Sequence, residues 1–568
     1  MVCKYLWGFF YYAAIFGTIF LLPFLCSSEK APYSTFARDA TAAPRIAYYD
    51  YIVIGGGTSG CALAATLSQD SQVLLLERGG LPYGNPTITN IGGFALTLAD
   101  VSPSSPSQLF VSTDGVINHR ARVLGGGSAL NAGFFTRAST KFVNTAGWDP
   151  KLVQQSYEWV ENKVAFEPET KQWQSAVRDG LLEAGVLPNN GFTYDHLIGT
   201  KVGGSIFDKD GHRHTAADLL EYAHPTNISL HFHATVQRIL FNPGERPRSN
   251  GVVFEDSTGV NHWAYLKEGT KNEILVTAGA LGSPQLLMLS GIGPADHLTD
   301  KGIQVIVDQP MVGQGMADNP MNALFIPSTQ PLEISLIQTV GITPFGSYVE
   351  AASGTIQLNW ASSLPQQLFN QTEQVYGVAR EQLQSAEAKA AVDSYLASSV
   401  QAGILLQKIM GPASSGHLEL KTLDAKDNPE VTFNYFSDPQ DLQKCVQGME
   451  TVIRVIESAA VSKFRYATGT IQLYIDLILA LPVNLRPRHL SATYSLEQFC
   501  MDTVMTIWHY HGGCHVNKVV DHNYKVVGVD ALRVIDGSTF YFDSPGTNPQ
   551  ATVMMLGRYM GQRILQER

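Results

Sequence analysis

The chain has 568 residues, of which 45% are hydrophobic and 16% charged, with a formal net charge of −11 at pH 7. This length and composition describe an ordered globular protein of two or more domains that can bury a large cofactor. The negative charge and the lack of a long Lys/Arg run exclude nucleic acid as an expected partner.

The N-terminus carries a targeting pattern. Lys4 precedes an apolar run from Tyr5 to Cys26, and small polar residues follow. Residues 1–28 therefore predict a secretory signal peptide and an extracellular or cell-wall protein with no stable membrane span once mature. The run is also just long enough for a signal anchor across a bilayer of about 30 Å. Pro23 near its end favours cleavage.

Secretion would permit disulfides and glycosylation. Two glycosylation sequons begin at Asn227 and Asn370, which predicts that both points face solvent. Four cysteines allow three complete pairings, so their spacing alone does not choose a partner for any of them. These are the cysteines left after cleavage: Cys61, Cys445, Cys500 and Cys514.

A nucleotide-binding turn is predicted next. Tyr51–Ile54 is an apolar run typical of a buried parallel strand, and a glycine turn follows it at once. Residues 62–67 then predict a helix, and residues 73–76 a second strand that ends at Glu77. This order of strand, glycine turn, helix, strand and acid is the Rossmann pattern for a dinucleotide.

Each glycine of that turn has a physical task. Gly55 permits the tight turn, Gly57 lets the backbone approach a pyrophosphate, and Gly60 lets helix and strand pack closely. Glu77 lies 20 residues after Gly57 and can accept hydrogen bonds from an adenosine ribose. An acid at this point favours FAD or NAD over NADP.

Further elements follow along the chain. A second glycine turn spans residues 121–131, and its glycines suggest backbone pressed against a flat ligand or another chain segment. Residues 274–277 predict a buried strand that leads into a helix over 278–287. The other predicted elements are a strand over 230–240, helices over 383–396 and 442–456, and a half-buried strand over 416–420.

His509 and Asn548 are the candidate catalytic pair, 39 positions apart. An imidazole accepts a hydroxyl proton near neutral pH, and a carboxamide donates a hydrogen bond to the oxygen left behind. Together they can hold and activate an alcohol. His511 is the rival base, and we expect it and His515 to be structural or to support the site residues without contacting the ligand.

Taken together, these segments resemble the glucose-methanol-choline (GMC) flavoprotein oxidoreductases over residues 46–568. Gly125–Asn131 is similar to one signature of that family, and Gly279–Gly293 to another. The nucleotide turn, His509, Asp536-Gly537 and Asn548-Pro549 complete the set in order.

The resemblance implies a mixed α/β and α+β fold. A Rossmann-type FAD-binding domain would be interleaved with a substrate-binding domain built on an antiparallel sheet with covering helices. The implied FAD-binding domain comprises residues 46–130, 215–325 and 505–568, and the implied substrate-binding domain, or cap, comprises residues 131–214 and 326–504.

The resemblance also implies the site. FAD would be bound covalently or non-covalently, no metal is expected, the adenine end would meet Glu77 and the backbone near Val236, and the flavin ring would lie below His509. The other implied FAD contacts are Gly55, Gly57, Thr58, Ser59, Gly60, Arg78, Val123, Gly126, Ser128, Asn131, Trp508, Asp536, Gly537, Asn548 and Pro549. A disulfide between Cys445 and Cys500 is implied in the same way, which leaves Cys61 and Cys514 as buried thiols.

Within the family, the chain resembles the plant branch that holds HOTHEAD-type proteins and mandelonitrile lyases. The lyases have a Tyr where this chain has Ile507 and a second His where it has Asn548, and they use a cap cysteine over the substrate. A His-Asn pair is instead familiar in the alcohol oxidases and dehydrogenases of the family.

The expected activity is therefore oxidation of a primary alcohol by proton transfer to His509 and hydride transfer to FAD. A long-chain omega-hydroxy fatty acid is the substrate that the branch suggests, with oxygen or a carrier as the electron acceptor. The alternatives are an FAD-containing hydroxynitrile lyase and a non-enzymatic glycoprotein that retains FAD for stability.

Overall fold

A six-stranded, all-parallel sheet forms one half of the molecule. The computed structural model describes residues 33, 35–357, 399–481 and 483–568. The strands lie in the order β1 (Ala37–Asp39), β11 (Ile228–Phe232), β4 (Val73–Glu77), β3 (Tyr51–Ile54), β15 (Glu273–Val276) and β26 (Leu532–Val534). Three separate stretches of chain therefore build one sheet.

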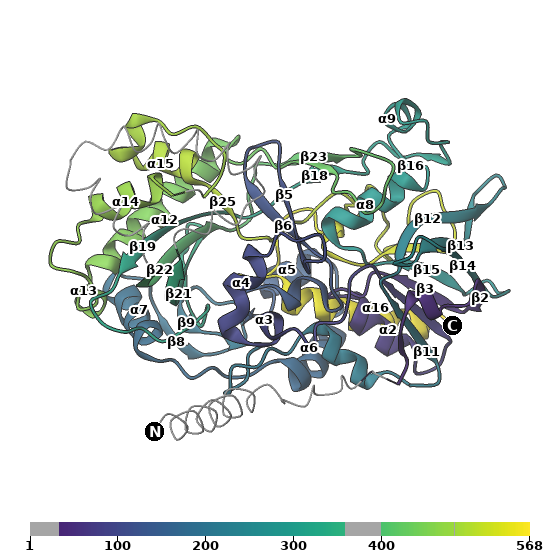
Figure 1. The fold of residues 1–568 in the computed structure, drawn as a ribbon, viewed down its shortest axis with the longest axis horizontal. Helices are drawn as coiled ribbons and strands as arrows, with labels where there is room; N and C mark the ends of the chain where they lie inside the picture. The colour runs from purple at the N-terminus through teal and green to yellow at the C-terminus, as the bar shows by residue number, and fades with distance from the viewer. Residues whose placement is uncertain (1–32, 34, 358–398, 482) are drawn as a thin grey trace, which may run out of the picture.

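The central strands β3, β4 and β15 are buried along their whole length, as their continuous apolar runs predict. Helix α2 (Gly60–Leu67) follows β3 and is also buried throughout, because α16 (Gln550–Gln566) packs against it. Figure 1 shows α2 and α16 beside β3 and β15. The predicted strand, turn, helix and strand of the Rossmann pattern are confirmed.

The predicted single strand over 230–240 is wrong. His233 has a φ of 57° between β11 and the next strand, so the chain turns there and enters a second sheet. That sheet contains, in order, β12 (Thr235–Asn242), β13 (Arg248–Glu255), β14 (Asn261–Leu266) and β2 (Ile46–Tyr49). The apolar pattern continues through the turn, which hid the break.

A seven-stranded, largely antiparallel sheet forms the other half. Its order is β25 (Met505–Thr506), β19 (Pro320–Pro327), β22 (Ser399–Ile409), β21 (Ser347–Gln357), β20 (Thr339–Ile342), β9 (Gly199–Val202) and β8 (Asn189–Phe192). Helices α12 (Pro439–Glu457) and α7 (Gln172–Glu183) pack against β21, and α14 (Ile471–Leu479) packs against β19. Figure 1 shows α12 and α14 over this sheet, away from α2 and α16. The mixed α/β fold with an antiparallel sheet and covering helices is confirmed.

The remaining described elements lie outside these three sheets. The strands are β5 (Ser107–Val111), β6 (Ile117–Ala121), β7 (Phe134–Phe135), β10 (Gly204–Ser205), β16 (Ile292–Gly293), β17 (Val307–Asp308), β18 (Gln314–Met316), β23 (Gly416–Glu419) and β24 (Glu430–Thr432). The α-helices are α3 (Pro86–Thr89), α4 (Phe94–Ala99), α5 (Thr140–Thr145), α6 (Pro150–Val164), α8 (Gly279–Leu289), α9 (Ala295–Asp300), α13 (Ala459–Ser462) and α15 (Leu496–Thr503). The 3₁₀ helices are η1 (Ala40–Ala42), η2 (Ile91–Gly93), η3 (Gly126–Ala129), η4 (Ala216–Tyr222), η6 (Leu490–Thr493) and η7 (Gly537–Thr539).

Helix α8, helix α12 and strand β23 correspond to the elements predicted over 278–287, 442–456 and 416–420. The helix predicted over 383–396 lies outside the described residues. Within the described part of the chain, no helix is long and apolar enough to cross a membrane.

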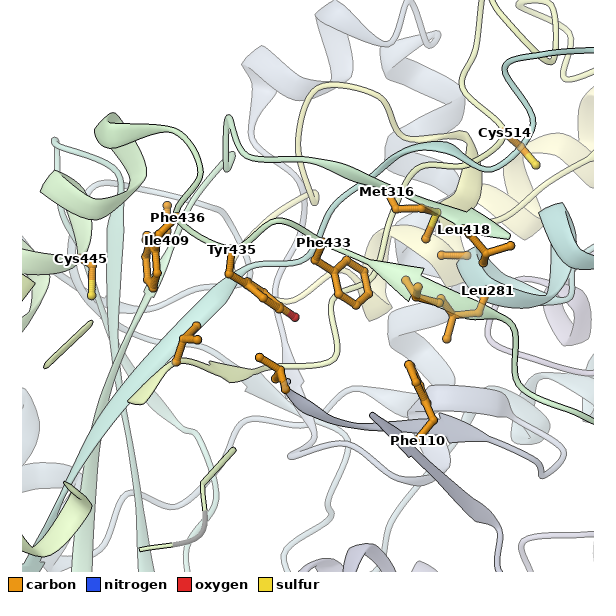
Figure 2. Packing of buried hydrophobic residues seen from close by; sticks show 14 of the residues in the cluster. Phe110, Leu281, Met316, Ile409, Leu418, Phe433, Tyr435, Phe436, Cys445 and Cys514 are labelled. Atoms are coloured by element: carbon orange, nitrogen blue, oxygen red, sulfur yellow. The ribbon is translucent and has the colours of Figure 1, made fainter. Parts of the chain in front are cut away.

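One hydrophobic cluster joins the two halves. It contains Val276 of the parallel sheet, Leu405 of the seven-stranded sheet and Met449 of α12, all fully buried. Figure 2 shows labelled members of this cluster spread from Cys445 of α12 to Leu281 of α8. Close packing across the join holds the two sheets in a fixed relation.

The sheets to which the strands belong indicate where the two domains meet. By sheet membership, β1 belongs with the FAD-binding half although it precedes residue 46, whereas β19 and β25 belong with the cap. We therefore propose cap boundaries near residues 319 and 507 in place of 325 and 505.

The asparagine of the first sequon does not stand free. Asn227 is half-buried, its Nδ2 donates to the Ser68 carbonyl at 2.9 Å, and its Oδ1 accepts from Gln72 at 3.0 Å. The nitrogen that would carry a glycan is thus occupied, contrary to the expectation of a solvent-facing site. Asn370 lies outside the described residues.

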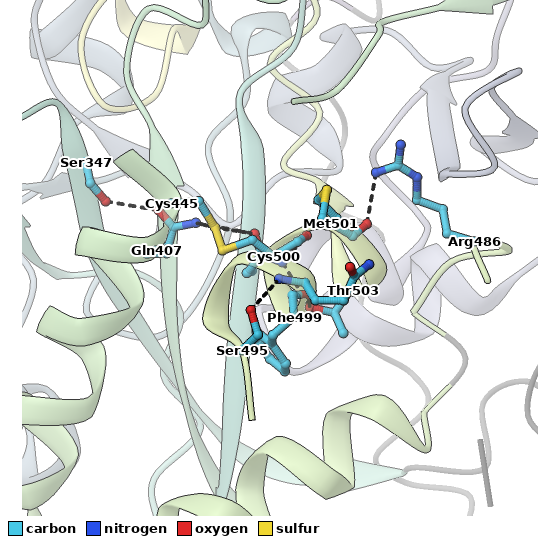
Figure 3. Close-up of a disulfide and its surroundings, with 11 residues drawn as sticks. Ser347, Gln407, Cys445, Arg486, Ser495, Phe499, Cys500, Met501 and Thr503 are labelled. Carbon is cyan, nitrogen blue, oxygen red and sulfur yellow. Dashed lines mark hydrogen bonds between the residues drawn. A yellow bond between two sulfur atoms is a disulfide. The ribbon is translucent and has the colours of Figure 1, made fainter. Parts of the chain in front are cut away.

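The disulfide between Cys445 of α12 and Cys500 of α15 is present, as the resemblance implied (Figure 3). It links positions 55 apart in the sequence, and both sulfurs are buried in the cap. Cys61 and Cys514 are buried free thiols, as expected.

Replacing both Cys445 and Cys500 by alanine should lower the free energy of unfolding by about 2–4 kcal/mol, because the open chain gains loop entropy when it unfolds. Thermal unfolding of the oxidised wild type and the double variant measures the loss. The control is Cys514→Ala, which breaks no covalent bond. An unchanged unfolding temperature in the double variant would contradict the prediction.

Candidate active site

A single cavity of about 320 Å³ collects nearly all of the predicted site residues. It begins at the carboxyl ends of the parallel strands, which is the position where open α/β sheets bind their ligands, and includes His509 and Asn548 in its wall. The predicted residues that line it are Gly55, Gly57, Thr58, Ser59, Glu77, Arg78, Val123, Gly126, Ser128, Asn131, Val236, Trp508, His509, Asp536, Gly537, Asn548 and Pro549.

Gly60 is the predicted cofactor residue that does not line this cavity. A Cβ at Gly60 would lie 2.0 Å from the Gly55 carbonyl oxygen and 2.7 Å from Thr277 Oγ1. Gly60 therefore allows α2 to pack closely on the sheet, as its place in the glycine turn predicts. It does not contact a ligand in the cavity. Gly57 is different, because a Cβ there would meet protein atoms only at 3.7 Å or more. The open space at Gly57 lies on the cavity.

Glu77 joins the turn after β3 to the end of β4. Its Oε2 accepts from the Gly56 amide at 2.9 Å, and its Oε1 accepts from the Gly79 amide at 2.7 Å. Burial raises the pKa of Glu77, and these two amides oppose that shift. Each carboxylate oxygen can accept a second hydrogen bond, so the residue can still receive ribose hydroxyls.

The two glycine turns are in direct contact. Gly125 has a φ of 92°, and its amide donates to the Gly56 carbonyl at 2.7 Å. A Cβ at Gly126 would lie 2.9 Å from Gly57 Cα, so a side chain there would push the turns apart. The second turn is therefore pressed against the first and shares the cavity with it.

The groups around this part of the cavity suit a pyrophosphate. Arg78 and Arg120 are half-buried, and the loss of solvent around their guanidinium groups lowers the pKa of each. Ser59 Oγ, beside the N-terminus of α2, is buried without a hydrogen-bond partner among the described residues. Unpaired N–H groups at a helix start, an orphan hydroxyl and two cations are a donor set for phosphate oxygens. The residues present thus fit the diphosphate of a dinucleotide.

Asp536 connects the C-terminal segment to α8. Its Oδ2 accepts from the Gly279 amide at 2.9 Å and from Ser283 Oγ at 2.5 Å. Its Oδ1 accepts from the Ser538 amide at 2.8 Å. This carboxylate fixes the wall of the cavity between two distant pieces of chain.

His509 and Asn548 meet on the wall of the same cavity. The Asn548 Nδ2 lies 3.5 Å from His509 Nε2. Burial, then the charge of Lys408 and then His511, lower the pKa of His509 well below the ordinary histidine value. The imidazole is therefore neutral at pH 7 and able to accept a proton.

The backbone of His509 is held by a buried carboxylate. Asp318 Oδ1 accepts from the His509 amide at 2.8 Å, and its Oδ2 accepts from the hydroxyls of Thr506 and Tyr435, both at 2.7 Å. Burial raises the pKa of Asp318 to about 6. Trp508, the residue before His509, has a φ of 61°, a strained conformation of the kind found at functional sites.

His511 and His515 do not line the cavity. The Nδ1 of His511 lies 2.9 Å from the His509 carbonyl oxygen, and His515 Nε2 lies 3.1 Å from that of Gly315. These contacts with backbone groups agree with the expected structural role.

Sequence reasoning missed Arg120, Asp318, Glu350 and Lys408. Arg120 was passed over inside the segment before the second glycine turn, although an arginine there was a visible signal. Asp318 follows no pattern that marks it as a partner of His509. The signal for Glu350 and Lys408 was a single charged residue within each of two strands, which is expensive to bury unless the charges are paired.

Comparison with known proteins agrees with this geometry. Residues 49–321 match the N-terminal part of the GMC oxidoreductases, and residues 412–557 match the C-terminal part. The chain is 51% identical to Protein HOTHEAD of Arabidopsis thaliana, over 95% of this chain and 91% of that protein. It is 43% identical to the sinalpyl alcohol oxidase Nec3 of Nesocodon mauritianus, over 92% and 89%, and 38% identical to (R)-mandelonitrile lyase 1 of Prunus serotina, over 95% and 91%.

The fold is shared with solved structures at low sequence identity. A formate oxidase of Aspergillus oryzae superimposes with a TM-score of 0.72 at 18% identity, covering 93% of this chain and 99% of that one. With relatives that match along almost the whole chain, and with a cavity whose donors suit a dinucleotide, this protein belongs to the GMC oxidoreductases, a family of FAD-binding flavoproteins.

Proposed function

We propose that the protein oxidises a primary alcohol to an aldehyde, with His509 and Asn548 as its catalytic residues. Bound FAD supplies the two-electron acceptor that takes the hydride from the alcohol carbon. His509 Nε2 takes the hydroxyl proton, and the Asn548 amide donates to the alcohol oxygen as its negative charge develops. The observation that carries the proposal is the 3.5 Å approach of these two side chains on the cavity wall.

Three features favour this reading over a hydroxynitrile lyase. Ile507, on the cavity wall, offers no hydroxyl, and Asn548 offers no second imidazole. The cysteines of the proposed cap, Cys445 and Cys500, are joined in the disulfide. The departing cyanide would therefore lack the acid that protonates it, and the cyanohydrin oxygen would lack the donor groups that the lyases use.

The proposed FAD contacts are the cavity residues from Gly55 to Pro549 given above, with Gly60 as a packing residue. For the substrate we propose a long-chain omega-hydroxy fatty acid, on the strength of the similarity to HOTHEAD. The acceptor that reoxidises the flavin is proposed to be oxygen or an electron carrier. The signal pattern in residues 1–28, together with the disulfide, supports a secreted protein.

An anaerobic screen tests the activity. Benzyl, short aliphatic and omega-hydroxy acyl alcohols are mixed in turn with the oxidised flavoprotein, and the flavin absorbance is followed. Bleaching by at least one alcohol is the expected result, with the omega-hydroxy acyl alcohol fastest. Release of cyanide from mandelonitrile without bleaching by any alcohol would instead establish the lyase.

The pH dependence of this reduction follows from the environment of His509. The base works only when neutral, and a lowered pKa keeps it neutral to a lower pH than an ordinary histidine. The rate should therefore stay level from about pH 8 to pH 6.5 and fall only below the ordinary histidine range. Stopped-flow reduction across this range is the measurement, and a half-maximal rate near the ordinary histidine pKa would contradict the assignment.

A further inference from the structure

A fully buried ion pair lies beside the catalytic pair. Lys408 of β22 and Glu350 of β21 have completely buried side chains, and Lys408 Nζ lies 2.8 Å from Glu350 Oε1. Lys408 is paired with Tyr348 in the strand register, so Glu350 is its diagonal neighbour on the same face of the sheet. A buried charge is retained only where it is paired, and such a pair is often neutral or unfavourable for stability. The Lys408–Glu350 pair is therefore expected to have a role other than stabilising the fold.

The face that carries this pair looks toward the C-terminal segment. Ser347 and Gln407, on the opposite face, contact Gly448 of α12. Tyr348 points the other way, and its hydroxyl donates to the Gly546 carbonyl at 3.0 Å. Lys408 Nζ donates to Asn548 Oδ1 at 3.3 Å. The seven-stranded sheet thus holds the loop that carries Asn548 at two points.

The two charges require opposite orientations of the Asn548 amide. With the oxygen toward Lys408, the nitrogen faces His509 Nε2 at 3.5 Å, and the oxygen lies between the Lys408 ammonium at 3.3 Å and the Glu350 carboxylate at 3.1 Å. With oxygen and nitrogen exchanged, the nitrogen donates to Glu350 Oε1 at 3.1 Å and to Thr547 Oγ1 at 2.9 Å. The oxygen then faces His509. The choice between the two orientations decides whether the site presents a donor or an acceptor.

We propose that the Lys408–Glu350 pair positions Asn548 for alcohol oxidation, with Lys408 holding the amide oxygen so that the amide nitrogen is presented to the reacting oxygen. The inference rests on the proposed function. Glu350 has the supporting task of keeping the buried ammonium charged, because a carboxylate at this distance stabilises that form. Both are positioning residues, since they act through Asn548.

These two positioning roles predict that replacing Lys408 slows flavin reduction more than replacing Glu350 does. Lys408→Met removes the group that holds the oxygen, and Glu350 then draws the amide nitrogen away from the substrate. The limiting rate of flavin reduction should fall about 100-fold, the usual effect of losing one donor to a developing oxyanion. Glu350→Gln leaves the lysine in contact with the amide oxygen and should lower that rate by no more than about fivefold.

Anaerobic stopped-flow reduction by the alcohol that works best on the wild type measures these effects. The limiting rate and the half-saturating alcohol concentration are taken separately, and the latter should change by less than about threefold, because the donor acts mainly in the transition state. Flavin content and absorbance show whether each variant is folded and loaded. Glu273→Gln is the control, because it disrupts the buried 2.7 Å pair with Arg533, away from the cavity.

The double variant Lys408→Met, Glu350→Gln covers the case in which Lys408→Met alone does not fold. It leaves no unpaired buried charge and keeps the side-chain volumes similar, and it should reduce about tenfold more slowly than wild type, since the amide is then free to adopt either orientation. Wild-type rates in Lys408→Met or in the double variant would overturn the positioning role. Equal losses in the two single variants would also overturn it. Failure of every alcohol to bleach the wild type would instead remove the proposed function, and this inference with it.

Discussion

Replacing His509 by alanine should slow flavin reduction by about 10²- to 10⁴-fold and leave FAD bound. The imidazole is the neutral base that faces Asn548, and alanine offers no atom that can take the hydroxyl proton. Because the groups suited to the diphosphate belong to other residues, the cofactor should remain in place. Stopped-flow reduction of the purified yellow variant by the preferred alcohol gives the rate.

His511→Ala is the matched comparison, because His511 is the rival base two positions away. It touches the His509 carbonyl and does not line the cavity, so its loss should lower the rate far less. A large loss in His511→Ala together with near-normal reduction in His509→Ala would exchange the two roles. Unchanged rates in both variants would favour the reading of a protein that holds FAD for stability alone.

Replacing Gly60 by alanine should give a protein that is colourless or insoluble. The added Cβ would lie 2.0 Å from the Gly55 carbonyl oxygen, and that oxygen belongs to the backbone of the nucleotide turn. The turn cannot yield without moving α2 away from the sheet. Overpacking of this kind costs about 1–3 kcal/mol or more, and here it also distorts the turn that would meet the diphosphate. Flavin absorbance per protein and thermal unfolding measure both effects.

The variant Gly57→Ala tests the approach of FAD to the turn without disturbing the packing of α2 on the sheet. Its Cβ would meet protein only at ordinary contact distance, so the variant should fold with near-normal stability and yet bind FAD weakly. Gly244→Ala, in an exposed loop, is the control and should match wild type in both respects. Full flavin content in Gly60→Ala would show that the helix can shift at little cost.

Much of the FAD-binding half was predictable because its signals are local. The run Tyr51–Ile54, the glycine spacing and Glu77 each act within one strand–turn–helix unit, and a unit of that kind is readable along the chain. The same reasoning went wrong at His233, where an unbroken apolar pattern concealed a turn between two sheets. The pattern of apolar residues along a segment shows which face of a strand is buried, but it does not show to which sheet that strand belongs.

For the catalytic end, the sequence by itself determined which functional groups are present: His509 in a Trp-His-Tyr-His-Gly-Gly stretch, a later Asn-Pro, and the nucleotide turn that calls for FAD. Only the tertiary structure decided that His509 and Asn548 meet at 3.5 Å, that Asp318 holds the backbone of the first, and that Lys408 and Glu350 compete for the amide of the second. The physical reason is that these contacts join segments 39 to 198 positions apart, and their geometry arises from the packing of two sheets on one core. A single charged residue inside a strand has no visible partner until the strands are placed side by side.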